Sequence, residues 1–174
     1  MKLVQLFISF LLFFTVSTNV LSQDINWVSL QEAETLQQDD PKKLMVFFET
    51  SWCGYCKKMK STVFKDADVI NYLNENYYPV KFDAESKTPL SFDGIEYSFD
   101  ADNGRRGAHE LAIDMLQGYM AYPSVVFLDE DFVSIRKLMG LQPVELFSTF
   151  LKYVNEDAYE SQDWFEYSGQ TTSN

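Results

Sequence analysis

Two cysteines separated by two residues are the residues of this sequence best suited to chemistry. Cys53 and Cys56 are its only cysteines. They follow the apolar run Leu44–Phe48, which predicts a strand buried on both faces, and they precede a segment of helical spacing that ends near Phe64. The first turn of a helix carries unpaired N–H groups and a partial positive charge. These would stabilise a Cys53 thiolate and lower the pKa of that thiol from about 8.5.

The neighbours of the two cysteines suit a reversible disulfide. Cys56 lies one helical turn after Cys53, so its sulfur can reach back and the pair can open and close without unfolding the domain. We expect Cys53 to be the exposed thiol, with Cys56 buried beneath it. Trp52 is expected to shield one side of the sulfurs, Gly54 to permit a tight turn, and Tyr55 to form an exposed rim.

Two other interpretations of the cysteines remain open. A purely structural disulfide is one, although a bridge across two residues closes almost no loop. Half of a metal site is the other, in which Cys53, Cys56 and His109 would be joined by a carboxylate. Two cysteines and one histidine are too few for a zinc site of Cys and His alone. The pattern favours a redox pair and predicts no metal.

The N-terminal segment 1–22 has the layout of a secretory signal peptide. Lys2 precedes an apolar run from Leu3 to Val16, and a more polar stretch with small residues ends at Ser22, where we predict cleavage. The alternative is a retained membrane anchor, but the apolar run is shorter than the roughly 20 residues that a span requires. We therefore expect an exported protein, periplasmic or secreted, with no stable membrane span after cleavage, in a compartment where disulfides persist.

The composition predicts one globular domain and excludes some partners. The chain has 174 residues, of which 46% are hydrophobic, and its net charge is −12. A nucleic-acid binder needs a basic face, so we expect no nucleic-acid partner. We place the domain at 23–154 and an acidic tail at 155–174. The tail is expected to be partly ordered at most, with Trp164 and Phe165 docking on the domain.

Strand and helix patterns alternate along the domain. The first helix is predicted at 30–38, because Ser29 and Glu32 form a capping-box pattern, and Asp66 is predicted to cap a later helix. A strand, a helix and a further strand in that order predict a right-handed βαβ unit, followed by an antiparallel hairpin. The strands are expected at 25–28, 44–48, 78–82, 124–128 and 132–138, and further helices at 110–116 and 143–154.

Residues 84–108 interrupt this pattern. Asp93-Gly94 and Asn103-Gly104 are turn signals, so we expect the insertion to form its own small hairpin. Its flanking elements should end near Cys53, because sites in α/β sheets gather at the carboxyl ends of strands. We therefore expect it to lie beside the cysteines and to shape substrate choice. The alternative is a surface excursion without a function, since long insertions cost little stability.

The segment from Trp52 to Lys57, Trp-Cys-Gly-Tyr-Cys-Lys, resembles the active-site motif of the thioredoxin superfamily. The resemblance continues through Phe64–Val69, Leu73-Asn74 and Val80–Asp83, where it is similar to exported thioredoxin-like reductase domains such as the C-terminal domain of DsbD. Tyr122–Phe127 resembles the cis-proline loop and the strand after it. The resemblance implies an α/β fold, a thioredoxin-like three-layer sandwich with a mixed central sheet and an insertion at about 84–108.

The resemblance also implies roles for particular residues. Cys53 matches the attacking cysteine and Cys56 the resolving one. Pro123 matches the cis-proline that packs against the disulfide, and Tyr122 would present its backbone to an extended substrate segment.

The sequence departs from the family pattern at two places. Phe47 stands where thioredoxin has a buried aspartate, beside the matching Lys81. Glu49 is the nearest acid in sequence and is our candidate proton acceptor for Cys56, with a solvated strand-end carboxylate as the alternative. The dipeptide Gly54-Tyr55 resembles that of the disulfide isomerase DsbC, whose separate dimerisation domain this chain has no room for.

These observations predict a thiol–disulfide oxidoreductase that reduces disulfides of exported proteins and needs no cofactor. Its partners would be exported proteins with disulfides or thiols, and an upstream electron donor that the sequence does not identify. We expect a monomer. The alternatives are a disulfide oxidase or isomerase, or a non-catalytic thioredoxin-like binding module. His109 is expected to be a surface or packing residue, and Arg105-Arg106 a solvated or salt-bridged pair.

Overall fold

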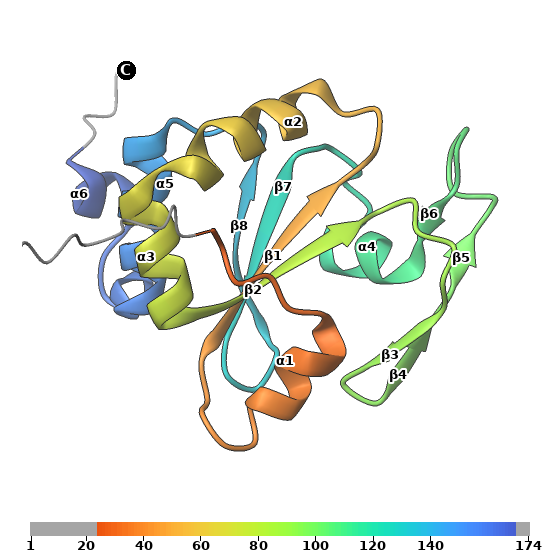
Figure 1. The fold of residues 1–174 in the computed structure, drawn as a ribbon, viewed down its shortest axis with the longest axis horizontal. Coiled ribbons are helices and arrows are strands. Elements are labelled where there is room, and N and C mark those ends of the chain that lie inside the picture. Colours follow the sequence, from red (N-terminus) through yellow and green to blue (C-terminus); the bar gives the residue numbers. More distant parts are fainter. Residues whose placement is uncertain (1–23, 170–174) are drawn as a thin grey trace, which may run out of the picture.

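The computed structural model describes residues 24–169, and a mixed four-stranded sheet lies at its centre (Figure 1). The strands follow the order β2 (Tyr77–Asp83), β1 (Lys43–Glu49), β7 (Ser124–Leu128) and β8 (Ser134–Met139). β1 pairs with β2 in parallel and with β7 in antiparallel orientation, and β7 pairs with β8 in antiparallel orientation. The predicted mixed sheet is therefore confirmed.

Helices cover both faces of this sheet and make the three predicted layers. The connection from β1 to β2 runs through α2 (Gly54–Ser61), a 3-10 turn at Val63–Lys65, and α3 (Ala67–Asn76), which pack on one face together with α5 (Val144–Asn155). The other face is covered by α1 (Leu30–Leu36), α4 (Glu110–Met115) and the insertion.

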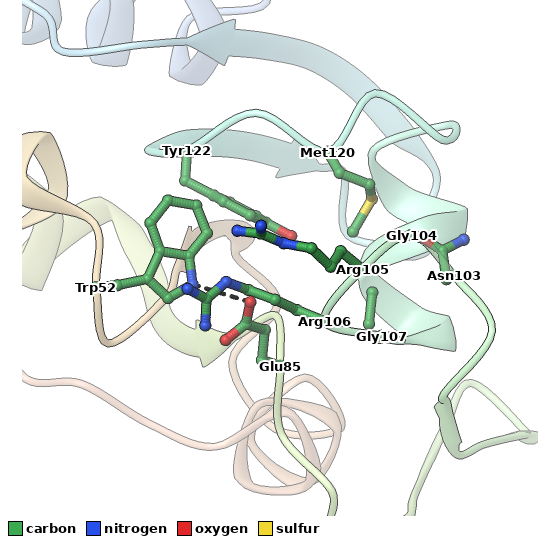
Figure 2. A pocket seen from close by; sticks show the side chains of 10 residues that line it. Trp52, Glu85, Asn103, Gly104, Arg105, Arg106, Gly107, Met120 and Tyr122 are labelled. Atoms are coloured by element: carbon green, nitrogen blue, oxygen red, sulfur yellow. Dashed lines mark hydrogen bonds between the residues drawn. The ribbon is translucent and has the colours of Figure 1, made fainter.

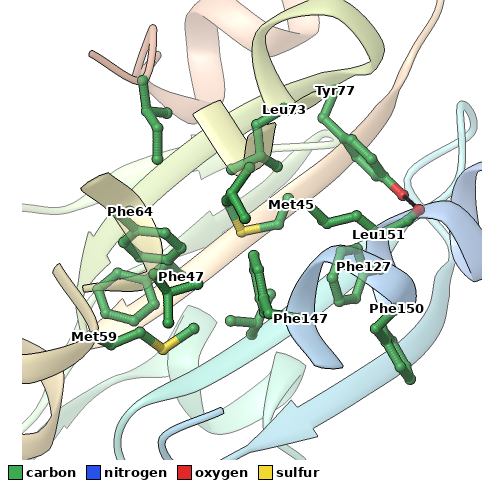
Figure 3. Close-up of a cluster of buried hydrophobic side chains, with 14 of the residues drawn as sticks. Met45, Phe47, Met59, Phe64, Leu73, Tyr77, Phe127, Phe147, Phe150 and Leu151 are labelled. Carbon is green, nitrogen blue, oxygen red and sulfur yellow. Dashed lines mark hydrogen bonds between the residues drawn. The ribbon is translucent and has the colours of Figure 1, made fainter. Parts of the chain in front are cut away.

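Strand β1 divides its side chains between two hydrophobic cores, because successive residues of a strand point to opposite faces. Met45 and Phe47 contribute to the core under α2, α3 and α5, which Figure 3 shows. Leu44, Val46 and Phe48 contribute to the core on the opposite face. All five side chains are fully buried, as the continuous apolar run predicts.

The helix caps agree with the predictions, whereas several boundaries differ. Ser29 and Glu32 form the capping box, with hydrogen bonds of 2.8 and 3.1 Å, but α1 ends at Leu36 and not at 38. Asp66 caps α3 by accepting from two backbone N–H groups. The helix predicted to reach Phe64 stops at Ser61, because Thr62 leaves helical geometry and its hydroxyl bonds back to Lys58.

Two strand predictions need correction. The expected edge strand at 25–28 is reduced to a single bridge between Val28 and Val80. The strand predicted at 132–138 begins at Ser134, because Phe132 adopts a left-handed backbone conformation with φ of 62°. Pro143 precedes the last helix as its N-cap, and the helix continues to Asn155.

The insertion is folded. β3 (Leu90–Phe92) and β4 (Ile95–Tyr97) form a hairpin around Asp93-Gly94, as predicted. β5 (Phe99–Asp100) and β6 (Ala108–His109) form a second pair, and the loop between them contains Asn103-Gly104. Phe92 and Tyr97 are buried in the core shared with α1 and α4.

The C-terminal segment contains two short elements within the described residues, in agreement with the predicted partial order. Residues 158–168 form a 3-10 turn (Ala158–Glu160) and α6 (Trp164–Ser168). Trp164 packs on Phe150 and Tyr153, with ring centroids 4.8 and 5.4 Å apart, so its predicted docking is confirmed. The same prediction is wrong for Phe165, which is 51% exposed. Aromatic contacts to α5, which the acidic composition did not reveal, hold this segment in place.

The predicted signal peptide, with its cleavage after Ser22, lies outside the described residues. Within 24–169, no helix has both the length and the apolar character that a membrane crossing requires.

Candidate active site

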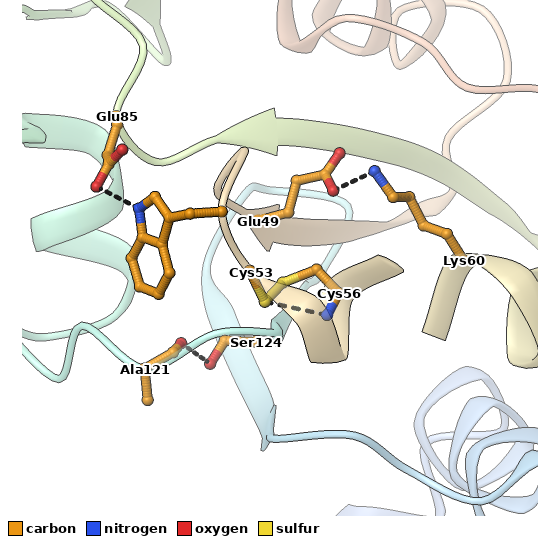
Figure 4. Close-up of a disulfide and its surroundings, with 8 residues drawn as sticks. Glu49, Cys53, Cys56, Lys60, Glu85, Ala121 and Ser124 are labelled. Carbon is orange, nitrogen blue, oxygen red and sulfur yellow. Dashed lines mark hydrogen bonds and ion pairs between the residues drawn. A yellow bond between two sulfur atoms is a disulfide. The ribbon is translucent and has the colours of Figure 1, made fainter. Parts of the chain in front are cut away.

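The end of β1 places the two cysteines at the start of α2 (Figure 4). Cys53 is the N-cap residue of α2, and its N–H donates to the carbonyl of Thr50 at 3.1 Å. The sulfur of Cys53 accepts a hydrogen bond of 3.0 Å from the backbone N–H of Cys56. An N–H group at a helix start directed at the sulfur is the arrangement that stabilises a thiolate.

Cys53 and Cys56 are joined by a disulfide with an S–S distance of 2.04 Å. Cys56 is fully buried, as predicted, while Cys53 is 4% exposed. The expectation of an exposed Cys53 is therefore wrong for the disulfide form, in which the first sulfur is almost completely covered by its surroundings. The small accessible fraction nevertheless belongs to Cys53.

The Tyr122-Pro123 loop lies beside the disulfide, between α4 and β7 (Figure 4). Its peptide bond is cis. Two hydrogen bonds hold the loop: the Ser124 hydroxyl donates to the Ala121 carbonyl at 2.8 Å, and the Gly140 N–H donates to the Pro123 carbonyl at 2.8 Å. Among the residues the structure describes, the main chain of Tyr122 makes no hydrogen bond, so it can accept an added strand.

Trp52 links the cysteine loop to the proline loop and to the insertion. Its ring lies edge-on to Tyr122, with centroids 6.1 Å apart, and its indole N–H donates to Glu85 at 2.9 Å. The Arg106 guanidinium lies 5.3 Å from the Trp52 ring centroid. Trp52 thus forms a wall beside the disulfide, although half of its own surface remains exposed. Burial, together with repulsion from Glu85, raises the pKa of Tyr122 to about 12.

Glu49 is not the solvated carboxylate that we considered as its alternative state. Its side chain is 14% exposed and forms an ion pair with Lys60 of α2, across the helix that carries the cysteines (Figure 4). The position of the family's buried aspartate is filled by Phe47, whose ring packs edge-on against Phe64 at 4.9 Å. Lys81, which matches the usual neighbour of that aspartate, lies 5.8 Å from the Trp27 ring centroid.

Of the two residues between the cysteines, Tyr55 agrees with its prediction and Gly54 does not. Tyr55 is 67% exposed and forms the predicted rim. Gly54 is the first residue of α2, and a Cβ added there would meet nothing within 4 Å. The structure therefore requires no glycine for a tight turn at this position, and that expectation is wrong.

Other candidate residues are divided between core and site. His109 is fully buried and is the N-cap of α4, where its Nδ1 accepts from the Leu111 N–H at 3.3 Å, which makes it a packing residue. Arg105 and Arg106 are both exposed, which agrees with the expected solvated pair, and the Arg106 guanidinium also lies over the Trp52 ring. Glu85 was not among our predicted site residues. Its position just after β2, at the carboxyl end of a strand, is the signal that could have identified it.

Acidic and sulfur ligands do not gather into a metal site in this part of the chain. Within residues 24–169, no group of three or more His, Cys, Asp or Glu side chains is placed to hold a metal ion.

The sheet order, the cysteine pair and the proline loop together point to one family, and the family comparison decides it. Residues 30–155 match the model of the thioredoxin-like domain. The chain belongs to the thioredoxin-like family. The match extends from α1 to the end of α5 and includes the insertion within a single thioredoxin-like domain.

Solved structures share the fold of this thioredoxin-like domain. The DsbH oxidoreductase aligns with a TM-score of 0.59 and 18% identity, covering 82% of this chain and 92% of that one. A thioredoxin-fold protein from Helicobacter pylori aligns with a TM-score of 0.57 and 18% identity, covering 75% and 80%. A thioredoxin from Thermus thermophilus aligns with a TM-score of 0.55 and 22% identity, covering 75% and 87%.

Among curated proteins, an uncharacterized protein of Archaeoglobus fulgidus is 37% identical over 65 residues. The aligned part covers 37% of this chain and spans about half, 51%, of that relative.

Proposed function

We propose that this protein is a thiol–disulfide oxidoreductase that reduces disulfides of exported proteins. The observation that carries the proposal is the hydrogen bond from the Cys56 N–H to the Cys53 sulfur at the start of α2. That contact favours the thiolate of Cys53, which is the nucleophile of disulfide exchange.

The proposed reaction is a two-electron exchange. In the reduced enzyme, the Cys53 thiolate attacks one sulfur of the substrate disulfide, forming a mixed disulfide and expelling the other sulfur as a thiolate that takes up a proton. Cys56 then loses its proton and attacks the sulfur of Cys53. The enzyme disulfide forms, and the second substrate thiol leaves. A dithiol donor must afterwards reduce the Cys53–Cys56 bond for another turnover.

The proline loop supports a protein substrate. Within residues 24–169 the main chain of Tyr122 is unpaired, so it offers a donor and an acceptor to an extended segment, as an added strand requires. Because this loop lies next to the disulfide (Figure 4), a segment paired there would bring its own sulfur to Cys53.

The reductive direction is supported by the resemblance of Phe64–Asp83 to exported reductase domains. Reduction potentials in the superfamily extend from about −270 mV for a reductant to about −120 mV for an oxidant. We expect this protein to lie near the lower value.

Export is supported by the segment from Lys2 to Ser22. Expression with this segment in a bacterial host should deliver a protein to the periplasm whose N-terminus is Gln23. Recovery of the uncut chain from the membrane fraction would instead indicate an anchor.

The proposed activity is tested by equilibrating the protein with glutathione redox buffers and by following insulin reduction with dithiothreitol as donor. We expect a potential near −270 mV and insulin reduction that Cys53→Ser abolishes. A potential near −120 mV would assign an oxidase or isomerase. Absence of any exchange with an intact dithiol would assign a binding module and overturn the proposal.

A further inference from the structure

A pocket separates the insertion from the cysteine and proline loops (Figure 2). Its volume is about 360 Å³. Trp52 and Tyr122 form one wall, Met120 closes one side, and the β5–β6 loop supplies the opposite wall with Arg105 and Arg106. Because Trp52 directly precedes Cys53 and Tyr122 directly precedes Pro123, the pocket begins at the edge of the redox site.

The pocket is positively charged although the chain as a whole is acidic. Its lining holds two cations, Arg105 and Arg106, and one carboxylate, Glu85, whereas the chain carries a net charge of −12. Neither arginine forms a hydrogen bond or ion pair with another residue in the described part of the chain. Glu85 is already engaged by the Trp52 indole. Both guanidinium groups therefore keep their donors available for a ligand.

The loop that presents the arginines is held in place by its ends. Gly107 has φ of +70°, and a Cβ there would lie 2.3 Å from the Phe99 ring and 2.8 Å from the Asp100 carbonyl. The next residues, Ala108 and His109, are buried, and the His109 N–H donates to the Ala84 carbonyl at 2.8 Å. This close packing fixes where the loop leaves the domain and hence where the arginines emerge.

We infer that this pocket recognises carboxylates of an acidic segment next to the disulfide of the protein that Cys53 attacks. The inference rests on the proposed function and names its substrate class. An extended chain advances about 3.3 Å per residue, so residues one to three positions from the bonded cysteine reach from Cys53 across Trp52. Guanidinium groups bind carboxylates through paired hydrogen bonds, and the aromatic walls pack on the aliphatic part of an Asp or Glu side chain.

The chain's own acidic segment is not the occupant. In Figure 1, α6 and the residues around it lie at the opposite end of the molecule from the insertion. Residues 158–168 are held there by packing on α5. Outside the pocket the protein is negatively charged overall, and this charge would repel a uniformly acidic partner. The partner should therefore be acidic near its disulfide and neutral or basic elsewhere.

The test compares disulfide-bonded peptides that differ only beside the cysteine, with two Glu, two Gln or two Lys. For the wild-type protein, we expect kcat/KM to be about fivefold higher for the Glu peptide than for the Gln peptide, as for a partly exposed ion pair. This ratio should fall toward one in Arg105→Gln with Arg106→Gln, and also at high salt. Arg105→Glu should invert it in favour of the Lys peptide.

Lys152→Gln is the matched control, because it removes one exposed cation from α5, far from the pocket. It should retain the Glu-over-Gln ratio. Because Arg105 makes no contact with a polar or aromatic partner in the described residues, its substitution is expected to leave folding intact, which circular dichroism checks.

The outcomes separate the inference from the proposed function. If the wild-type protein reduces none of the peptides, the proposed function fails. If it reduces all of them with equal kcat/KM, or if the arginine variants keep the ratio, only the inference is overturned. The last measurement is the turnover of oxidised glutathione, a small disulfide that carries carboxylates. Loss of its turnover in the arginine variants with an unchanged peptide ratio would overturn the acidic segment as the occupant.

Discussion

At the scale of single residues, the two cysteines differ in what surrounds each sulfur. Cys53 accepts the N–H of Cys56 at the helix start, whereas Cys56 is fully buried on the first turn of α2. For the proposed reaction, this asymmetry favours attack by the first sulfur and resolution by the second, because the nucleophile must be both ionised and reachable.

The first prediction concerns the order of attack. Cys56→Ser should accumulate mixed disulfides with substrate proteins through Cys53, because the resolving thiol is missing. Cys53→Ser should accumulate none. Non-reducing gels of affinity-purified variants, followed by mass spectrometry of the cross-linked cysteine, provide the measurement. The same covalent partners on both variants would refute the assigned order.

The second prediction concerns Glu49 as a proton acceptor for Cys56. The carboxylate is largely buried at the end of β1 and is paired with Lys60 on the cysteine helix. Glu49→Gln should slow release of the substrate from the mixed disulfide by about tenfold at neutral pH, below the usual range for a general base because water can substitute. Stopped-flow measurement of that single turnover provides the readout.

Lys60→Met is the control for this prediction, because it breaks the same ion pair and leaves the carboxylate in place. It should slow the resolving step much less than Glu49→Gln. Equal effects of the two substitutions would mean that the ion pair, and not proton transfer, is what matters.

At the scale of elements, His109 connects the insertion to the domain. It ends β6 and begins α4, its Nε2 lies 3.1 Å from the Thr88 carbonyl, and its ring packs edge-on against Phe82 at 5.1 Å. Because Nδ1 accepts from the Leu111 N–H, Nε2 is the nitrogen that donates. One buried side chain therefore satisfies a backbone group on each side of it.

The third prediction follows from this role. His109→Phe should lower the free energy of unfolding by about 1–3 kcal/mol, since it leaves buried backbone groups without partners. His109→Asn should cost less, because asparagine is a good N-cap. Urea denaturation of the three proteins measures the difference, and a His109→Phe variant as stable as the wild type would contradict the role.

At the scale of the whole molecule, a buried ammonium ties the C-terminal segment to the sheet. Lys43 of β1 is almost fully buried and forms ion pairs with Glu130 at 3.2 Å and with Asp157 at 2.9 Å. Burial by itself lowers the pKa of Lys43, but the hydrogen bonds that the ammonium donates to Asp157 and Glu130, together with the attraction of their charges, outweigh it, and the pKa of Lys43 is raised above its ordinary value. Three segments that are far apart in the chain are thus held together by the ammonium group of Lys43.

The fourth prediction is the pH dependence of this contact. A lysine whose pKa is raised on folding stabilises the fold fully below its unfolded pKa, about 10.4, and loses that contribution as pH rises through the folded value. The wild-type protein should therefore lose stability above about pH 10.4 more steeply than Lys43→Met.

Tyrosines with raised pKa values, such as Tyr97 and Tyr167 at about 12, add a loss of the same sign to both proteins. The difference between the two curves, measured by urea denaturation from pH 8 to pH 11.5, reports Lys43 together with its effect on Tyr159, whose pKa the lysine acts to lower. Parallel curves would show that Lys43 carries none of the pH dependence.

The sequence by itself determined the features that depend on a few neighbouring residues. The apolar run before Cys53, the capping box of Ser29 and Glu32, and the Asp93-Gly94 turn each act through local backbone geometry or short-range hydrogen bonds. Such local signals act in the same way in any fold, which is why the buried strand before the cysteines, the first helix and the folded insertion were predictable.

Only the tertiary structure decided the environment of those residues. Glu85, Trp52 and Arg106 come from three separate loops, and nothing in their local sequence requires them to meet. The packing of Trp164 on α5 and the burial of Lys43 likewise bring distant segments together. These contacts depend on the path of the whole chain and on shape complementarity between its layers. They therefore cannot be predicted from residue types and spacing alone.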